Sequence, residues 1–385
     1  METNSKTEPL FSFDYISLKN NSFMMIHFPS LTLLFVFTHL CLWGESFHIF
    51  SPSSKEKTLW IVKAIPHGEG LKLEGAEKVK FDFSGRVITA HPSKPLLYVT
   101  ATGGDLGKVP GAVVFLNKDG SYQKHKNINF NDGACYLSLD KENRHILGVS
   151  YGNGRLNVYP LDEQGIPGKA VTTIDEGKQQ AHCILLPPDG KNVYIPYVKE
   201  NLAILQYAYD GKTGKVTPLE PKDAKPPLGS GPRHMAYHPT LPMVYFSNEQ
   251  GIGLSSYRRE ANGQLKVEQD ISILPPGMSK IGLSASDLLI TPDGKFLFAG
   301  LRGHRQDFDR ISRYRVLEDG KAEFLGLTEA DQIPWGLALS PDGKFLLVTA
   351  TNGASLSAYL ISKDGNLKKV ASLAWDPRMS DLVTR

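Results

Sequence analysis

The chain has 385 residues, of which 41% are hydrophobic and 22% are charged, and its formal net charge is +3. This balance is typical of a globular protein with a large buried core. Because no run of Lys and Arg is long enough to form a clustered basic face, the composition argues against a nucleic-acid partner.

The N-terminal region differs from the rest of the chain. Residues 1–22 are polar and irregular, whereas residues 23–44 are almost uncharged. Within them, residues 31–43 are too few for a spanning helix of ~20 residues but match the apolar region of a secretory signal peptide. We therefore predict an N-terminal extension, residues 1–45, with a signal peptide, and a folded domain at residues 46–385. A short amphipathic or anchoring helix is the alternative.

The location of the protein depends on that signal. A functional signal peptide would send the chain to the periplasm or outside the cell, and without one the chain would stay in the cytoplasm. In neither case do we expect a stable membrane span, because the apolar stretch is short.

Three cysteines, Cys41, Cys135 and Cys183, have no spacing typical of metal ligands. We expect Cys135 and Cys183 to be small buried residues in strands, with a disulfide between them as the alternative. No metal site is predicted.

From residue 86 onward, a unit of about fifty residues repeats. Each unit has an apolar strand, a turn often of the Pro-Asp-Gly type and a second apolar strand, as in "SDLLITPDGKFLFAGLRGH" and "WGLALSPDGKFLLVTATNG". A third and a fourth strand follow, and four strands per unit of this length form the blade of a β-propeller. One turn position recurs every 47 to 53 residues, at Pro92, Lys141, Pro188, Pro239, Pro292 and Pro341.

The number of units sets the size of the ring. Six units are clear, and residues 46–85 hold a further, degenerate set of strands. We predict an all-β fold with seven four-stranded antiparallel blades around a central channel; six blades are the alternative. Pairing of the N-terminal and C-terminal strands would close the ring and leave no exposed edge.

Two positions in each unit should face the same mouth of the channel, because both lie at the open end of the hairpin formed by the first two strands. The position six residues before the turn gives Arg86, Cys135, His182, Arg233, Ser286 and Trp335. The position ten residues after it gives Thr102, Tyr151, Val198, Glu249, Arg302 and Thr351. His234 and Asp287 lie one residue behind the first set.

Ionisable groups gather on three neighbouring units of this map. A guanidinium group binds carboxylate or phosphate through two parallel hydrogen bonds, and Glu or His can transfer a proton. We therefore expect a site for a small anionic substrate, with His182, Arg233, Glu249 and Arg302 as the catalytic set. Further substrate contacts are expected from Arg233, Arg302, His234, His304 and Tyr151.

Less specific interpretations apply to the same residues. Arg233 and Glu249 can form a structural ion pair in a water-filled channel. Arg86 and Asp287 are expected on a solvated rim. His91 and His238 lie in turns on the opposite face and are expected to be structural.

Several segments resemble the lactonase, seven-bladed β-propeller family over about residues 80–370. They are "GPRHMAYHPTLPMVYFSNE", "SASDLLITPDGKFLFAGLRGH", "AHCILLPPDGKNVYIPYV" and "SYGNGRLNVYPLDEQG". The family includes the bacterial propeller-type 6-phosphogluconolactonase and the fungal carboxy-cis,cis-muconate cyclase. The resemblance implies an enzyme that opens a lactone with water or closes one onto an unsaturated acid. The site residues proposed for the cyclase correspond to His182, Arg233, Glu249 and Arg302.

Four positions depart from the family pattern. Tyr136 stands where the family commonly has His, Tyr197 where it has Asp, Trp335 where it has Arg, and Asp287 where it often has Glu. These differences place the exact substrate in question.

Three functions follow from these observations. The first is a lactonase resembling 6-phosphogluconolactonase that hydrolyses a small anionic sugar lactone; Arg233 and Arg302 would bind the anion or the developing oxyanion, and Glu249 or His182 would activate water. The second is a cycloisomerase that forms a lactone. The third is a non-catalytic propeller that binds a small molecule or a protein. No cofactor is expected.

Overall fold

The structure of the protein is a computed structural model that describes residues 15–18, 21–28, 31–37, 44–105 and 107–385. The chain divides into two compact units between Gly44 and Glu45. The smaller unit contains an antiparallel sheet of β1 (Tyr15–Leu18), β2 (Asn21–Phe28) and β3 (Leu31–Phe37).

The predicted signal peptide falls partly on this sheet. Residues 31–37 form β3, so this part of the apolar run is a strand and not the anchoring helix considered as the alternative. Residues 38–43, the end of the predicted apolar region, lie outside the described residues. Among the residues that are described, no helix is long and apolar enough to cross a membrane.

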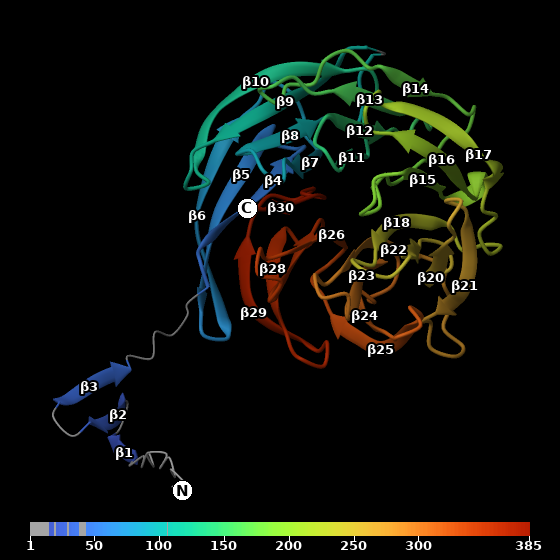
Figure 1. The fold of residues 1–385 in the computed structure, drawn as a ribbon. Coiled ribbons are helices and arrows are strands. Elements are labelled where there is room, and N and C mark those ends of the chain that lie inside the picture. Colours follow the sequence, from blue (N-terminus) through green and yellow to red (C-terminus); the bar gives the residue numbers. More distant parts are fainter. Residues whose placement is uncertain (1–14, 19–20, 29–30, 38–43, 106) are drawn as a thin grey trace, which may run out of the picture. The chain divides into compact units, whose positions relative to one another are not determined.

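Residues 45–385 form a ring of seven blades around a central channel (Figure 1). The seven-bladed fold is thus confirmed, and six blades is wrong because residues 47–80 supply three strands of a further blade. Blade 1 joins β30 (Val383–Thr384), β4 (Phe47–Ser53), β5 (Thr58–His67) and β6 (Gly70–Lys80). Blade 2 contains β7 (Val87–Ala90), β8 (Leu96–Thr100), β9 (Val109–Leu116) and β10 (Tyr122–Phe130).

The remaining blades follow in chain order. Blade 3 contains β11 (Tyr136–Leu139), β12 (His145–Val149), β13 (Leu156–Pro160) and β14 (Thr172–Ile174). Blade 4 contains β15 (Asn192–Tyr197), the 3₁₀ helix η1 (Lys199–Asn201), β16 (Ala203–Asp210) and β17 (Lys215–Asp223). Blade 5 contains β18 (Pro232–Tyr237), β19 (Met243–Asn248), β20 (Gly253–Arg259) and β21 (Leu265–Ser272).

Blade 6 contains β22 (Leu283–Ile290), β23 (Phe296–Gly303), β24 (Arg310–Val316) and β25 (Ala322–Glu329). Blade 7 contains β26 (Pro334–Leu339), β27 (Phe345–Ala350), β28 (Ser355–Ile361) and β29 (Leu367–Ala374). The second strands of blades 2 to 7, such as β8, β15 and β27, are buried at every residue. A strand covered on both faces by neighbouring blades has no solvent side, so it reads as a continuous apolar run rather than an alternating one.

The ring closes through the C-terminal strand. β30 pairs antiparallel with β4, with Val383 opposite Phe50 and Thr384 opposite Ile49. The backbones of His48 and Arg385 exchange two further hydrogen bonds of 2.7 and 2.9 Å. This pairing of the two ends removes the open edge that blade 1 would otherwise present.

The innermost segment of blade 4 is irregular. Residues 181–185 pair with β15 only at Ala181–Tyr197 and Leu185–Tyr194. Pro196, within β15, has no N–H group to donate to this segment, which weakens the ladder at that point. His182 lies on this segment, and its backbone N–H donates to the carbonyl oxygen of Pro196 over 3.0 Å.

The turns far from the site follow the sequence prediction. Gly190, Gly294 and Gly343 of the Pro-Asp-Gly turns have φ values of 69°, 75° and 71°, which glycine adopts without steric cost. In the His-Pro turns the histidines have a structural role, as expected. Nδ1 of His91 accepts the backbone N–H groups of the residues two and three positions later, and Nδ1 of His238 does the same.

Candidate functional site

A cavity of about 510 Å³ opens at the mouth of the channel where the first strands begin and the second strands end. The structure brings together there most of the positions that the repeat map selects. The charged and polar lining residues are Arg86, Thr102, Tyr136, Tyr151, His182, Lys199, Arg233, His234, Glu249, Asp287, Arg302, His304, Trp335, Ser380 and Asp381. Three mapped positions, Val198, Ser286 and Thr351, do not line it.

A buried cluster of three charges lies at the centre of the cavity wall. Nε of Arg233, in β18, lies 3.1 Å from Oε2 of Glu249, and Nη2 of Arg302, in β23, lies 3.7 Å from Oε1 of the same carboxylate. The arginine side chains are only 1% and 3% exposed. Two cations therefore share one anion, and the cluster keeps a net positive charge.

Both guanidinium groups have spare hydrogen-bonding capacity. Nη2 of Arg302 donates to the carbonyl oxygen of Ala285 over 2.7 Å. Within the described residues, Nη1 of Arg233 and Nε of Arg302 find no hydrogen-bond partner, and Nε of Arg233 meets Glu249 as an ion pair without hydrogen-bond geometry. Because a buried unpaired donor is costly, the cluster is suited to an anionic ligand that supplies acceptors.

The indole ring of Trp335 lies against three arginine side chains of the cavity. Its ring centroid lies 4.3 Å from Cζ of Arg302, 5.7 Å from Cζ of Arg233 and 5.9 Å from Cζ of Arg86. The π face of an indole attracts cations, so it offsets part of the missing counter-charge. Burial, and then the charge of Arg233, lower the pKa of Arg302 to about 9.

His234 and Asp287 form a hydrogen-bonded pair. Nδ1 of His234 lies 2.6 Å from Oδ1 of Asp287. The carboxylate also accepts the backbone N–H groups of Leu288 and Leu337, each over 2.8 Å. Although burial favours the protonated acid, these contacts keep the pKa of Asp287 below its usual range. An ionised carboxylate only accepts, so Nδ1 of His234 is the donor and Nε2 carries the lone pair of the neutral ring.

The expectation that Asp287 lies on a solvated rim is therefore wrong. Its side chain is only 13% exposed. The physical reason is its place one residue inside the mouth, where the first strand of blade 7 presents an N–H group to the carboxylate. Arg86, by contrast, is exposed at the mouth.

Two imidazole rings stand side by side in the cavity. The ring centroid of His182 lies 5.2 Å from that of His234 and 5.5 Å from that of Tyr151. Burial, followed by the charge of Arg233, lowers the pKa of both histidines, and that of His182 lies well below the ordinary value. Both rings are consequently neutral at pH 7.

Three cavity residues lie on its solvent-exposed rim. Nε2 of His304 lies 2.8 Å from Oγ of Ser284, and Nζ of Lys199 lies 5.6 Å from the ring centroid of Tyr151. Lys199, His304 and Arg86 are all exposed. The repeat map missed Lys199, because it selected Val198. The chain turns at Lys199, whose φ is 56°, and Lys199 lines the cavity in place of Val198.

The map also missed Asp381. Asp381 lies two residues before β30, the first strand of blade 1, and Asp287 lies within β22, the first strand of blade 6. Both residues line the same cavity. Blade 1 takes its first strand from the C-terminus, so the turn used as a reference in the other units has no counterpart there. A search for the closing strand in the last ten residues would have found it.

Two of the three cysteines lie in the described part of the chain. Cys135 and Cys183 are both free, so the alternative of a bond between them is wrong. Burial raises the pKa of Cys135 to about 12, which leaves the thiol protonated and unreactive. Cys41 lies outside the described residues. No group of three or more His, Cys, Asp or Glu in the described part of the chain has an arrangement suited to a metal ion.

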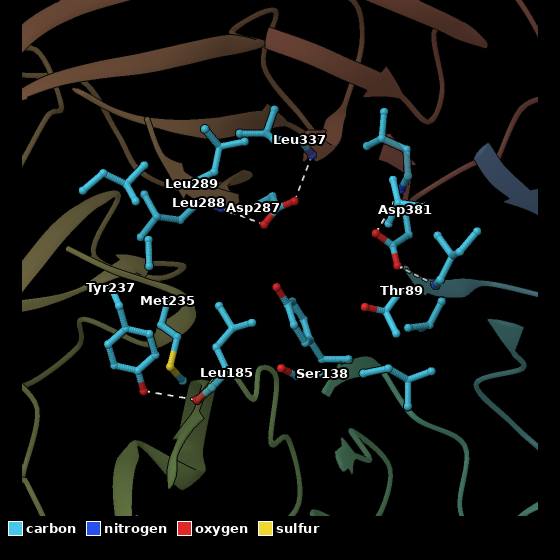
Figure 2. A pocket seen from close by; sticks show the side chains of 18 residues that line it. Thr89, Ser138, Leu185, Met235, Tyr237, Asp287, Leu288, Leu289, Leu337 and Asp381 are labelled. Atoms are coloured by element: carbon cyan, nitrogen blue, oxygen red, sulfur yellow. Dashed lines mark hydrogen bonds between the residues drawn. The ribbon is translucent and has the colours of Figure 1, made fainter. Parts of the chain in front are cut away.

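A second cavity, of about 330 Å³, continues the channel away from the mouth. Figure 2 shows its wall, with aliphatic side chains such as Leu185 and Leu289 around the channel. The two cavities share Val87, Tyr136, Asp287 and Asp381. These four residues therefore mark the boundary between an outer chamber that gathers the charged side chains and an inner one with many aliphatic side chains.

Comparisons with known proteins agree with this geometry. Residues 55–378 match the family described as lactonase, seven-bladed β-propeller. The chain is 30% identical to the 6-phosphogluconolactonase of Pectobacterium carotovorum over 243 residues, covering 62% of this chain and 70% of that protein. It is 30% identical to the 6-phosphogluconolactonase of Sodalis glossinidius over 296 residues, covering 75% and 85%.

A solved structure shares the fold. The periplasmic gluconolactonase of Pseudomonas aeruginosa superposes with a TM-score of 0.77 at 20% identity, over 88% of this chain and 99% of that chain. The resemblance inferred from the sequence segments is thus confirmed.

Glu249 supplies the negative charge of the central cluster. Glu249→Gln leaves Arg233 and Arg302 without their shared anion, so we expect the free energy of unfolding to fall by about 3 kcal/mol. Phosphate should restore part of this loss by binding between the arginines and should stabilise the variant more than the unchanged protein. Urea unfolding with and without phosphate measures both effects.

The matched control is Glu268→Gln, which breaks the more exposed pair with Arg258, whose Nε lies 3.0 Å from the Glu268 carboxylate. It should change stability by at most about 1 kcal/mol and show no added response to phosphate. Equal effects of the two substitutions would contradict an anion site at Arg233 and Arg302.

Proposed function

This chain belongs to the seven-bladed β-propeller lactonase family, and from that premise we propose that it hydrolyses small anionic sugar lactones. The observation that carries the proposal is the buried Arg233–Glu249–Arg302 cluster beside the His234–Asp287 pair in one cavity. Such a cavity holds what lactone opening needs: donors for an oxyanion and a fixed neutral base. The relatives reported above carry lactonase names, which favours hydrolysis over the cyclase alternative.

The arginines stabilise charge at the carbonyl group. Attack on a lactone moves negative charge onto the carbonyl oxygen, and donors held in a buried site stabilise that charge without reorganisation. Arg233 and Arg302 fill this role, and Glu249 holds the two guanidinium groups in place through its two oxygens. At the rim, Lys199 and Arg86 bind a phosphate or carboxylate on the rest of the substrate, and Tyr151 and His304 contact its hydroxyl groups.

His234 is the base that activates water. The sequence alone favoured Glu249 or His182, but both oxygens of Glu249 face guanidinium groups. His182 has no carboxylate to stabilise its protonated form, because Nδ1 finds no partner in the described part of the chain. Asp287 gives His234 that support and fixes its tautomer, as an aspartate does for the histidine of a serine-protease triad. His182 then orients the substrate beside it.

Loss of the arginine donor tests the proposed reaction. We expect turnover of 6-phosphogluconolactone and glucono-δ-lactone above the spontaneous rate, with a preference for the phosphorylated substrate. Arg233→Ala should lower kcat/KM about 100-fold or more, the usual effect of removing one oxyanion donor. Arg258→Ala, on the outer strands of the same blade, is the matched control and should leave both rates unchanged. A folded protein that turns over neither lactone would instead be a binding propeller.

Loss of the imidazole tests the choice of base. We expect His234→Gln and Asp287→Asn to lower kcat by about 100-fold or more with little change in KM, because both remove the positioned lone pair. His182→Gln should mainly raise KM. The base must be neutral and the pKa of His234 is lowered, so kcat should hold at neutral pH, and its decline on the acid side should lie below the ordinary histidine range. A large kcat loss in His182→Gln alone would contradict this choice.

We further propose that the protein is exported. Residues 31–43 fit a signal peptide, and the structurally similar lactonase of Pseudomonas aeruginosa is periplasmic by name. Phosphorylated sugar lactones are made inside cells, so export favours a lactone that carries a carboxylate as the natural substrate. Mass spectrometry of the protein from cell fractions should find a shortened N-terminus outside the cytoplasm. A full-length cytoplasmic protein would rule this out.

A further inference from the structure

Asp381 occupies in blade 1 the position that Asp287 occupies in blade 6. Each carboxylate accepts the N–H group of the next residue and an N–H group from the first strand of the following blade. For Asp381 these donors are Leu382, at 3.0 Å, and Ile88, at 2.8 Å. The two aspartates therefore accept the same pair of backbone hydrogen bonds in two different blades.

The surroundings of the two carboxyl groups differ in one respect. Asp287 has His234 as a third partner, whereas no ion pair reaches Asp381 within the described residues. The groups that face Asp381 are Asp287 from β22, Tyr136 from β11 and, at the exposed rim beside β7, Arg86. Asp287 and Tyr136 carry no positive charge, and the guanidinium group of Arg86 is exposed to solvent at the rim.

Asp381 also lies at the boundary between the chambers. It lines both the charged cavity at the mouth and the inner cavity behind it, and Figure 2 shows it across the channel from Asp287. Because its two oxygens are held by backbone N–H groups, the carboxyl group has a fixed direction at the floor of the substrate cavity. A substrate bound by Arg233 and Arg302 would rest against this floor.

The protonation states of the two carboxyl groups diverge as a result. Burial, together with the nearby charge of Asp287, raises the pKa of Asp381 to about 8. Burial raises the pKa of Tyr136 well above its usual value, so the phenol stays neutral. At pH 7 the cavity thus holds a neutral imidazole at His234 and a protonated carboxyl group at Asp381. Environments that push two pKa values apart in this manner commonly define the base and the acid of an active site.

We propose that Asp381 is the proton donor to the leaving oxygen of the lactone ring. The inference rests on the lactonase function proposed above. The His234 imidazole takes a proton from water while the water oxygen bonds to the carbonyl carbon. The bond from that carbon to the ring oxygen then breaks, and the ring oxygen takes the proton of Asp381. The product acid releases one proton, and solvent exchange returns His234 and Asp381 to their starting states.

The experiment uses two lactones that differ in the leaving group. Glucono-δ-lactone leaves as a basic alkoxide that needs a proton, whereas dihydrocoumarin leaves as a phenolate, with a pKa of about 10, that needs none. In the full-length protein, Asp381→Asn should lower kcat/KM for glucono-δ-lactone about 100-fold or more and change that for dihydrocoumarin by only a few-fold.

Asp376→Asn is the matched control for disturbance of the C-terminal segment. Asp376 is also buried and accepts the indole N–H group of Trp60 over 2.9 Å, but it lines neither cavity. This variant should leave the ratio of the two rates unchanged. A parallel loss on both lactones in Asp381→Asn would assign Asp381 a structural role and overturn the proposal, while the lactonase function would stand.

The pH dependence of the unchanged protein gives a second test that needs no variant to fold. The proton donor is lost as the pH rises through the pKa of its carboxyl group. After subtraction of the spontaneous rate, kcat for glucono-δ-lactone should therefore fall above about pH 8, and kcat for dihydrocoumarin should not. Absence of this fall, or its persistence in Asp381→Asn, would overturn the proposal. If the protein hydrolyses neither lactone, the proposed lactonase function itself is wrong, and with it the premise for a proton donor.

Discussion

The pairing of β30 with β4 is the constraint on which the rest of the ring depends. Each blade in the closed ring buries both of its faces against its neighbours, and without closure the first and last blades would each expose one face to solvent. The chain meets this requirement by taking the first strand of blade 1 from its C-terminus. This closure also shapes the site, because it brings Asp381, which lies just before β30, to the wall of the same cavity as Arg86 of blade 2 and Arg302 of blade 6.

Closure also explains why a charged cavity is tolerated. The propeller fixes Arg233, Glu249 and Arg302 on the ends of strands from two adjacent blades, where their positions cannot relax toward water. Buried ion pairs seldom stabilise a fold, because desolvation offsets their attraction. The cluster of two guanidinium groups, one carboxylate and an indole face therefore lowers the stability of the fold but fixes the positions of its hydrogen-bond donors. Such fixed donors are expected in a site where they must be in place before negative charge develops on the substrate.

The sequence alone predicted the ring of blades more completely than it predicted the residues of the site. The fifty-residue period and the paired apolar strands predicted the blades, because a strand covered on both faces has a continuous apolar pattern. The same period placed His182, Arg233, Glu249 and Arg302 around one mouth. The pattern failed where the backbone departs from the average blade. At Lys199 a left-handed residue shifts the lining by one position, and Asp381 stands in a blade whose turn reference is missing.

The error at Asp287 has a different origin. Its position in the repeat was right, but a repeat map says nothing of how deeply a side chain is buried or what lies across the blade boundary. The carboxylate is held by His234 from blade 5 and by the N–H group of Leu337 from blade 7. Such contacts join residues about fifty positions apart on each side, and only the closed ring determines them.

Asp287 and Asp381 show how a repeat fold separates acid from base. Both residues accept two backbone N–H groups at the same position of their blades. These backbone contacts alone would therefore give the two carboxyl groups the same protonation state. The difference comes from the neighbouring unit: blade 5 supplies His234 to Asp287, whereas Asp381 faces Asp287 and the neutral Tyr136. Burial, and after it the charge that remains on Asp287, raises the pKa of Asp381, whereas the contact with His234 keeps the pKa of Asp287 low. The neighbouring unit thus decides which carboxyl group can act as an acid.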